Sequence, residues 1–411
     1  MDETLQTFHR VMSFAGIPIY AKANWDSKFR LTHQVFNVFI GFLTFIFTTV
    51  FVIVNYSDLL LCIQGACIWT TGLIMFISLG VCLIFRQKFR MFLTEMGFND
   101  TMLEMPLIDY VMKKEFENGK KLKELKLKVI ETQSRLLKLT RVLLKLYVAS
   151  VWLCATLYIC SPIYFMITKE DKSARLLAFD MWFPWSMENL YVYAATFVFH
   201  AYAGYLCCIA YPGFQLTISL LVGQIVRQLK IINFVMYHLE EIALELNKES
   251  LAYRQLYCTE ILTQCVDHYI KMKRFSNNLN VICQPFYLAL ILVATMLVCV
   301  CSVKIAISDK LSLDTMKYYV HESCFILVVY MFCLLGQQVD DECENLERAV
   351  TEKWYKFDKK HKVNVRIFKM AVNHRMPIYI FGSIKLSLPT FTWFIRNGMS
   401  FFTLVMSVLE D

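Results

Sequence analysis

Residues 35–54 read VFNVFIGFLTFIFTTVFVIV, twenty consecutive residues without a charged side chain. A helix needs about 20 mostly apolar residues to cross the roughly 30 Å hydrocarbon core of a membrane, so this stretch predicts a spanning helix. Six further stretches are similarly long and apolar: residues 59–85, 142–167, 191–221, 281–307, 319–335 and 391–409. The sequence therefore predicts an all-α membrane protein with seven transmembrane helices.

The composition supports a membrane protein. The chain has 411 residues, of which 57% are hydrophobic and 18% charged, and its mean hydropathy is +0.46. A soluble domain carries about 25% charged residues, more than this chain has. The apolar content is too high, and the content of glycine and proline too low, for a disordered, collagen-like or disulfide-stapled chain. Most of the fifteen cysteines lie inside apolar runs, where they behave as small hydrophobic residues. The net charge of +8 favours basic cytoplasmic loops over nucleic-acid binding.

Lysine and arginine are distributed unevenly between the two sides of the predicted membrane. The segments before span 1 and after spans 2, 4 and 6 hold 33 of the 42 basic residues, whereas those after spans 1, 3 and 5 hold 6. Cytoplasmic loops carry the excess of Lys and Arg. With seven spans, the N-terminus is therefore predicted to be cytoplasmic and the C-terminus extracellular.

The cytoplasmic connections predict a helical stem. Residues 111–147, 237–275 and 340–362 carry leucines at helical spacing among charged residues, and the first of these runs directly into span 3. We divide the chain into a cytoplasmic N-terminal segment (1–34), spans 1–6 with a ligand pocket and the cytoplasmic helices (35–335), a cytoplasmic stem or anchor (336–390) and a last span (391–411).

Enzyme chemistry finds no support. The sequence lacks the motifs H-E-x-x-H, G-x-S-x-G and the Walker loop, and its histidines and cysteines show no metal-ligand spacing. We predict no catalytic residue, no cofactor and no metal site. His200 and His321 lie in predicted spans, and each is either a ligand contact or a hydrogen-bonded packing residue.

The last span carries a polar stripe. Thr392, Arg396, Ser400, Thr403 and Ser407 are spaced by three or four residues, which places them on one face of a helix. Lipid disfavours a stripe containing arginine, so this face lines a pore or packs against neighbouring helices. Leu404 borders the stripe, and a ring of such leucines closes a pore by excluding water.

Aromatic and small polar side chains recur at helical spacing in the outer halves of spans 2, 3, 4 and 6. They predict an apolar pocket for a small ligand, although ordinary packing explains each pair equally well. The outer loop 168–190, aromatic from Phe179 to Trp185, either covers this pocket or lies in the membrane interface. The candidate ligand-binding residues are Trp69, Leu73, Phe76, Tyr147, Ser150, Cys154, Tyr158, Tyr193, Phe197, Tyr318 and His321.

Three segments and the inverted orientation together resemble the insect odorant receptor family. The segments are FDMWFPWSMENL (179–190), MFCLLGQQVDDECENLERAVTEKWY (331–355) and LSLPTFTWFIRNGMSFFTLV (386–405). Ser400-Phe401 stands where Ser-Tyr is more usual in the family. Cys333, Gly336, Trp354 and Tyr355 match the family pattern at the end of span 6.

The resemblance implies a ligand-gated, non-selective cation channel of the plasma membrane of sensory neurons. Such receptors are tetramers built with a shared co-receptor subunit, and the last span lines the pore. The family pattern places the hydrophobic gate at Leu404 and a polar constriction at Ser407, with Ser400 and Thr403 on the same lining face. Because the connection at 227–275 is shorter than that of the co-receptor, the chain resembles a tuning subunit that binds a volatile apolar ligand.

Three alternatives remain from the sequence. A gustatory-type channel usually ends in a Tyr-rich motif closing with Gln-Phe, which Ser407-Val408 does not reproduce. A G-protein-coupled receptor has the opposite orientation. A secondary transporter favours two similar halves with broken helices, and the chain shows no such repeat.

Overall fold

The structure is a computed structural model and describes residues 2–17, 20, 28–98, 100–116, 119–168, 176–246, 251–308, 313–352, 354–357 and 359–410. Its helices are α1 (Asp2–Phe14), α2 (Lys28–Val54), α3 (Leu59–Ile84), α4 (Arg86–Phe92), α5 (Pro106–Lys113), α6 (Lys120–Thr168), α7 (Leu190–Tyr237), α8 (Leu239–Leu246), α9 (Leu251–Ile307), α10 (Leu313–Thr351), α11 (Lys359–Asn373) and α12 (Leu388–Glu410). A π-helical turn η1 (Leu93–Phe98), two 3-10 turns η2 (Thr101–Glu104) and η3 (Trp354–Lys356), and the strands β1 (Tyr379–Phe381) and β2 (Ile384–Lys385) complete the described elements.

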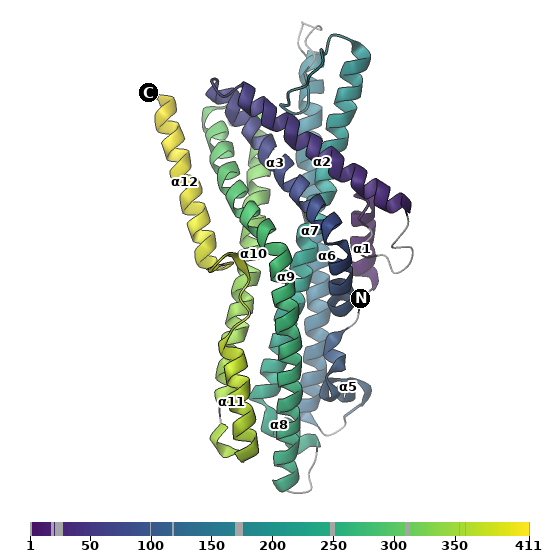
Figure 1. Ribbon diagram of the computed structural model, residues 1–411, viewed down its shortest axis with the longest axis vertical. Helices are drawn as coiled ribbons and strands as arrows, with labels where there is room; N and C mark the ends of the chain where they lie inside the picture. The colour runs from purple at the N-terminus through teal and green to yellow at the C-terminus, as the bar shows by residue number, and fades with distance from the viewer. Residues whose placement is uncertain are drawn as a thin grey trace.

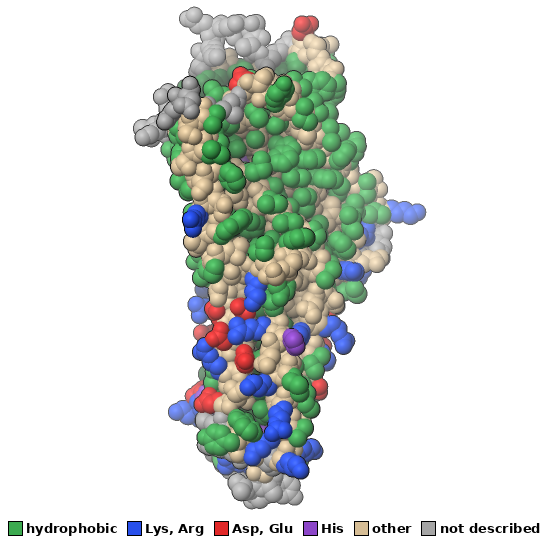
Figure 2. Space-filling model, turned by 60° about the vertical axis from the view of Figure 1, so that its left-hand side comes forward, with side chains coloured by type: hydrophobic (Ala, Val, Ile, Leu, Met, Phe, Trp, Pro, Cys, Tyr) green, Lys and Arg blue, Asp and Glu red, His purple; other side chains and the backbone are tan. Residues whose placement is uncertain are grey.

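The helices form one elongated bundle, with α5, α8 and α11 at the lower end and the end of α12 at the upper end (Figure 1). Hydrophobic side chains cover the upper half of the face in Figure 2, and Lys, Arg, Asp and Glu gather on the lower half. Lipid-facing surfaces are apolar and water-facing surfaces are charged, so the upper half suits a membrane and the lower half suits water. The prediction of an all-α membrane protein is confirmed, with one small hairpin added.

Four helices are much longer than a membrane requires. α6 has 49 residues, α7 has 48, α9 has 57 and α10 has 39. At 1.5 Å per residue, about 20 residues cross the membrane, and the remainder extends into the lower, charged half. The predicted spans 142–167, 191–221, 281–307 and 319–335 each lie within one of these helices.

The predicted stem helices differ in their boundaries. The residues expected to be helical over 111–147 are divided between α5, which ends at Lys113, and α6, which begins at Lys120 and continues into the span predicted at 142–167. The expected helix over 237–275 is likewise divided between the end of α7, α8 and the first half of α9. The one expected over 340–362 is divided between α10, η3 and the start of α11. Leucine spacing alone does not mark these interruptions.

Six helices of the described chain are long and apolar enough to cross a membrane: α2, α3, α6, α7, α9 and α10. α12 encloses the predicted seventh span but is not among these six helices. The seventh crossing therefore stays a prediction.

α7 lies at the centre of the bundle. Almost every side chain between Ala203 and Met236 is buried, and α7 packs against α6, α10 and α3. A helix that is apolar on all faces belongs in an interior, because no face of it suits water. Pro212 lies inside α7 without ending it.

A short hairpin connects the stem to α12. β1 pairs antiparallel with β2, and Gly382 takes the left-handed φ of +55° in the turn. Leu386, the residue after β2, donates its backbone N–H to Ile378 O over 2.8 Å and crosses α10 at Gly336. A Cβ on Gly336 would lie 2.2 Å from Leu386 O, so only glycine allows this crossing.

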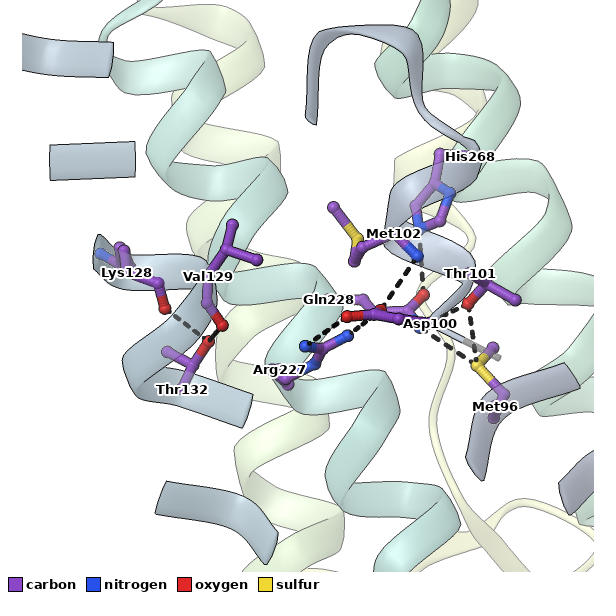
Figure 3. Close-up of polar contacts among 10 residues, drawn as sticks. All are labelled: Met96, Asp100, Thr101, Met102, Lys128, Val129, Thr132, Arg227, Gln228 and His268. Atoms are coloured by element: carbon purple, nitrogen blue, oxygen red, sulfur yellow. Dashed lines mark hydrogen bonds and ion pairs between the residues drawn. The ribbon is translucent and has the colours of Figure 1, made fainter. Parts of the chain in front are cut away.

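A polar network connects α7 to the stem (Figure 3). Arg227 Nη2 of α7 lies 2.5 Å from Asp100 Oδ1, and the arginine side chain is 2% exposed. Gln228 Nε2 donates to Thr101 Oγ1 over 2.8 Å, and Gln228 Oε1 lies 2.9 Å from His268 Nε2 of α9. A buried arginine requires a partner, and here Asp100 supplies it.

Candidate ligand-binding cavity

A cavity of about 70 Å³ lies between α2, α3, α6, α7 and α10 in the hydrophobic half, with the segment before α7 against it. Small side chains on α3 and α7 leave this space open, among them Gly72, Ala203 and Gly204. The lining residues are Thr44, Ile68, Thr71, Gly72, Met75, Tyr147, Val151, Cys154, Ala155, Tyr158, Phe179, Met181, Ala203, Gly204, Cys207, Cys208, Tyr211, His321, Cys324 and Phe325.

The polar groups of the lining mostly bond to the protein itself. Tyr147 Oη donates to Gln215 Oε1 over 2.6 Å, and Tyr211 Oη donates to Thr71 O over 2.6 Å. Thr44 Oγ1 donates to a carbonyl of its own helix over 2.9 Å. A ligand in the cavity therefore meets mainly apolar surface, which favours an apolar molecule.

Tyr158 differs from these groups. Its ring lies 5.5 Å from Phe179 and 6.2 Å from His321. Within the described chain, its hydroxyl contacts Cys67 Sγ, at 3.9 Å. A contact of that length to sulfur is weak, so the Tyr158 hydroxyl is the lining group best able to donate to a ligand.

The segment before α7 is held against the cavity by His200. The backbone N–H of Phe179 donates to His200 Nδ1 over 3.2 Å, and the two rings stack at 5.6 Å. His200 is fully buried, and its Nε2 atom has no hydrogen-bond partner within the described residues. His200 was expected to be either a ligand contact or a hydrogen-bonded packing residue. In the structure it packs on the Phe179 ring and accepts a hydrogen bond from the Phe179 backbone. The polar start of the 168–190 loop, residues 169–175, lies outside the described residues.

Four predicted pocket residues line the cavity: Tyr147, Cys154, Tyr158 and His321. Two more touch the lining without being part of it. Ser150 Oγ lies 3.6 Å from Cys324 Sγ, and the ring of Tyr318 lies 6.3 Å from that of Tyr158.

The other five predicted residues lie away from the cavity lining. Trp69 Nε1 donates to Thr49 Oγ1 of α2 over 2.9 Å, and Phe76 stacks on Phe45 of α2 at 6.2 Å. Leu73 shares the face of α3 that carries these two residues and packs against the main core. Tyr193 donates to Leu176 O over 2.8 Å and contacts Phe197 in the upper part of α7. Their predicted roles in binding remain untested.

The sequence analysis missed most of the lining on α3 and α7. Thr71, Gly72 and Met75 lie on the face of α3 next to the predicted one, and Ala203, Gly204, Cys207, Cys208 and Tyr211 line the cavity from α7. The available signal was the cluster of small residues at 203, 204, 207 and 208, because small side chains leave space between packed helices.

The predicted pore residues lie on one exposed face of α12. Ser400, Thr403, Leu404 and Ser407 are exposed, and Leu404 retains 60% of its accessible surface. The opposite face packs against the chain, where Phe394 is fully buried and a Cβ on Gly398 would lie 3.1 Å from Val298. The stripe therefore points away from its own subunit.

A long helix bundle with an apolar half, a charged half and an internal cavity defines the class of multi-span helical membrane proteins. The family model described as "7tm Odorant receptor" matches residues 121–399, more than half of the chain. The chain therefore belongs to the seven-transmembrane odorant receptor family, as its motifs predicted.

Two solved structures have a similar fold. The insect olfactory receptor OR5 from Machilis hrabei in complex with eugenol superposes with a TM-score of 0.77, and a second structure of the same receptor superposes with a TM-score of 0.72. In each case the identity is 12%, and the match covers 99% of this chain and 98% of that chain. A comparison with curated protein sequences gives no match.

Proposed function

We propose that this chain is the odorant-binding subunit of a ligand-gated, non-selective cation channel in the plasma membrane of sensory neurons. The observation that carries the proposal is the apolar cavity, whose polar groups mostly bond to the protein and leave the Tyr158 hydroxyl to orient a ligand. The OR5 receptor with eugenol supports it, because a protein of the same fold holds a small molecule.

The ligand is a volatile, mostly apolar molecule. Burial of its apolar surface supplies most of the affinity, at roughly 25 cal/mol per Å². One hydrogen bond from Tyr158 adds about 0.5–1.5 kcal/mol, or roughly two- to tenfold in affinity. We expect this hydroxyl to distinguish odorants that carry an oxygen atom from hydrocarbons of the same shape.

The test compares Tyr158→Phe with the wild-type subunit in cells that also express the co-receptor. Odorant panels are paired, each oxygen-containing odorant with its hydrocarbon analogue, and currents give the half-maximal concentrations. Tyr158→Phe should weaken the response to the oxygen-containing member roughly two- to tenfold and leave the hydrocarbon unchanged.

Trp69→Ala is the matched control, because Trp69 is a large aromatic residue that contacts α2 instead of the cavity. Tyr158→Ala should raise the half-maximal concentration for both members of a pair. Trp69→Ala should change either value by less. Equal responses of wild type, Tyr158→Phe and Tyr158→Ala to every odorant would place the ligand outside this cavity.

We further propose that α12 lines the pore beside the same helix of the other subunits in a tetramer with the co-receptor. The exposed stripe supports this, because hydroxyls that donate to their own helix leave oxygen lone pairs facing outward, where they can accept from water or coordinate cations. Leu404 interrupts these oxygens with an apolar group, which suits a gate that closes by excluding water. The positive charge of Arg396 opposes cation entry. We therefore expect that Arg396 lies in a wide vestibule, or that the co-receptor subunits of the tetramer lack an arginine at this place.

A further inference from the structure

Three side chains from different helices converge beside the cavity. Cys67 of α3, Cys301 of α9 and His321 of α10 bring their sulfur and nitrogen atoms within 4.8 Å of one another. Cys67 Sγ lies 3.4 Å from Cys301 Sγ and 3.5 Å from His321 Nδ1. Both cysteines are fully buried and His321 is nearly so. None of the sequence motifs pointed to this cluster, since its members are up to 254 residues apart.

The hydrogen bonds around His321 assign its tautomer. Thr71 Oγ1 has one hydrogen, which it donates to Cys67 O over 3.2 Å. The same oxygen lies 3.0 Å from His321 Nε2, so with the hydroxyl hydrogen directed at Cys67 O it accepts a hydrogen bond from Nε2–H. His321 Nδ1 is then unprotonated and directs its lone pair at the two sulfur atoms. Metal-binding histidines are held in this way, with the second ring nitrogen donating to a fixed oxygen.

We propose that Cys67, Cys301 and His321 form a binding site for a thiophilic d10 metal ion, with Zn²⁺ the best match. Tetrahedral Zn²⁺ with Zn–S bonds of about 2.3 Å and Zn–N bonds of about 2.0 Å separates two sulfurs by about 3.8 Å and a sulfur from a nitrogen by about 3.5 Å. The distance from Cys67 Sγ to His321 Nδ1 matches this geometry, and that from Cys67 Sγ to Cys301 Sγ is shorter by about 0.4 Å, while all three atoms lie within 4.8 Å of one another. Small rotations of the cysteine side chains supply the difference.

Charge favours Zn²⁺ over a monovalent ion. Binding releases the two thiol protons to water, and the resulting two thiolates and one Zn²⁺ have no net charge. A neutral cluster is far easier to bury in an apolar bundle than a charged one. With three protein ligands, the fourth position remains for water.

The site adjoins the odorant cavity without depending on it. His321, Thr71 and Tyr158 line the cavity, so metal binding would fix the position of one cavity wall. Metal binding is measured without any odorant, and its outcome is therefore independent of the proposed channel function.

The experiment titrates the full-length chain, purified in detergent under reducing conditions, with Co²⁺ and then with Zn²⁺. Co²⁺ reports cysteine ligands through its thiolate charge-transfer absorption, and Zn²⁺ should displace it at about one ion per chain. Cys67→Ala and His321→Ala should each weaken uptake more than tenfold. Thr71→Val, which removes only the oxygen that orients His321, should weaken it roughly ten- to hundredfold.

Cys82→Ala is the matched control, because Cys82 is equally buried on the same helix and lies outside the cluster. It should bind the metal as the wild type does. A second measurement uses only the wild-type chain: Zn²⁺ should slow alkylation of Cys67 and Cys301, but not of Cys82, in peptide mass spectrometry. This measurement decides the matter even where a variant fails to fold.

Three results would overturn the proposal. One is the absence of Co²⁺ and Zn²⁺ uptake, with no protection of the two thiols. Another is uptake that Cys67→Ala leaves unchanged. The third is a Cys67–Cys301 disulfide in the isolated protein whose reduction restores no metal binding. Uptake of Cu⁺ without Zn²⁺ would overturn the choice of ion.

Discussion

Gly336→Ala tests how α12 is attached to the bundle. A Cβ at this position would lie 2.2 Å from Leu386 O and 2.9 Å from Leu386 C. Ordinary contacts of a Cβ start near 3.4 Å, so the hairpin backbone must move by about 1 Å. Leu386 is held by its bond to Ile378 O and is 2% exposed, which leaves it little freedom to move.

The expected loss of stability follows from two opposing effects. Overpacking against a backbone group costs about 3 kcal/mol, at the upper end of the usual range. Replacing glycine by alanine inside a helix returns about 1 kcal/mol. The net loss is about 2 kcal/mol in the free energy of unfolding, or roughly thirtyfold in the ratio of folded to unfolded protein.

The assay is thermal unfolding in detergent, followed with a thiol-reactive dye. Thirteen of the fifteen cysteines are buried. Unfolding exposes their thiols to the dye, so the dye signal rises strongly on unfolding. Gly80→Ala is the control, because a Cβ there meets nothing within 4 Å; it should leave the midpoint unchanged or raise it slightly. Equal midpoints for Gly336→Ala and Gly80→Ala would refute the reasoning about the crossing.

Three further predictions follow from the fold and the proposed pore. The Leu404→Ser subunit, expressed with the co-receptor, should carry more current in the absence of odorant than the wild type. A basal current equal to that of the wild type, with normal delivery to the cell surface, would show that Leu404 does not form the gate. Arg227→Met should lower the free energy of unfolding by about 3 kcal/mol, because it leaves the Asp100 carboxylate without its partner; adding Asp100→Asn should recover part of the loss, and no recovery would argue against the pair. A C-terminal tag should be labelled by antibody on intact cells and an N-terminal tag only after permeabilisation, whereas labelling of the N-terminal tag alone would reverse the orientation.

Helical periodicity predicted much of the fold and only part of the cavity. The long apolar stretches gave the membrane helices, because each must bury its backbone polar groups within itself and so carries the signal locally. On α3 the period grouped Trp69, Leu73 and Phe76 correctly on one face. It did not reveal that this face meets α2, while the adjacent face, with Gly72 and Met75, meets the cavity. Which face points where depends on neighbouring helices far away in the sequence.

Local sequence patterns could not predict the cluster of Cys67, Cys301 and His321 or the hairpin, for the same reason. Cys67, Cys301 and His321 each look like an ordinary apolar-span residue, and only the packing of α3, α9 and α10 brings them together. The crossing at Gly336 required a contact with Leu386, 50 residues later. The spacing of residues in a sequence predicts which side chains are neighbours on one helix, but it does not predict contacts between helices that are far apart in the sequence.

The hydroxyls of the α12 stripe bear on how this chain enters the bilayer. Ser400 Oγ donates to Arg396 O over 2.9 Å, Thr403 Oγ1 to Ser400 O over 2.9 Å, and Ser407 Oγ to Leu404 O over 2.8 Å. Hydroxyls satisfied within their own helix tolerate lipid, so a newly synthesised subunit can enter the bilayer before it meets a partner. Arg396 is the exception, because no internal carbonyl neutralises a guanidinium. In the proposed channel, bilayer insertion would then come before subunit assembly, and Arg396 would be the stripe residue that still requires water or a partner subunit.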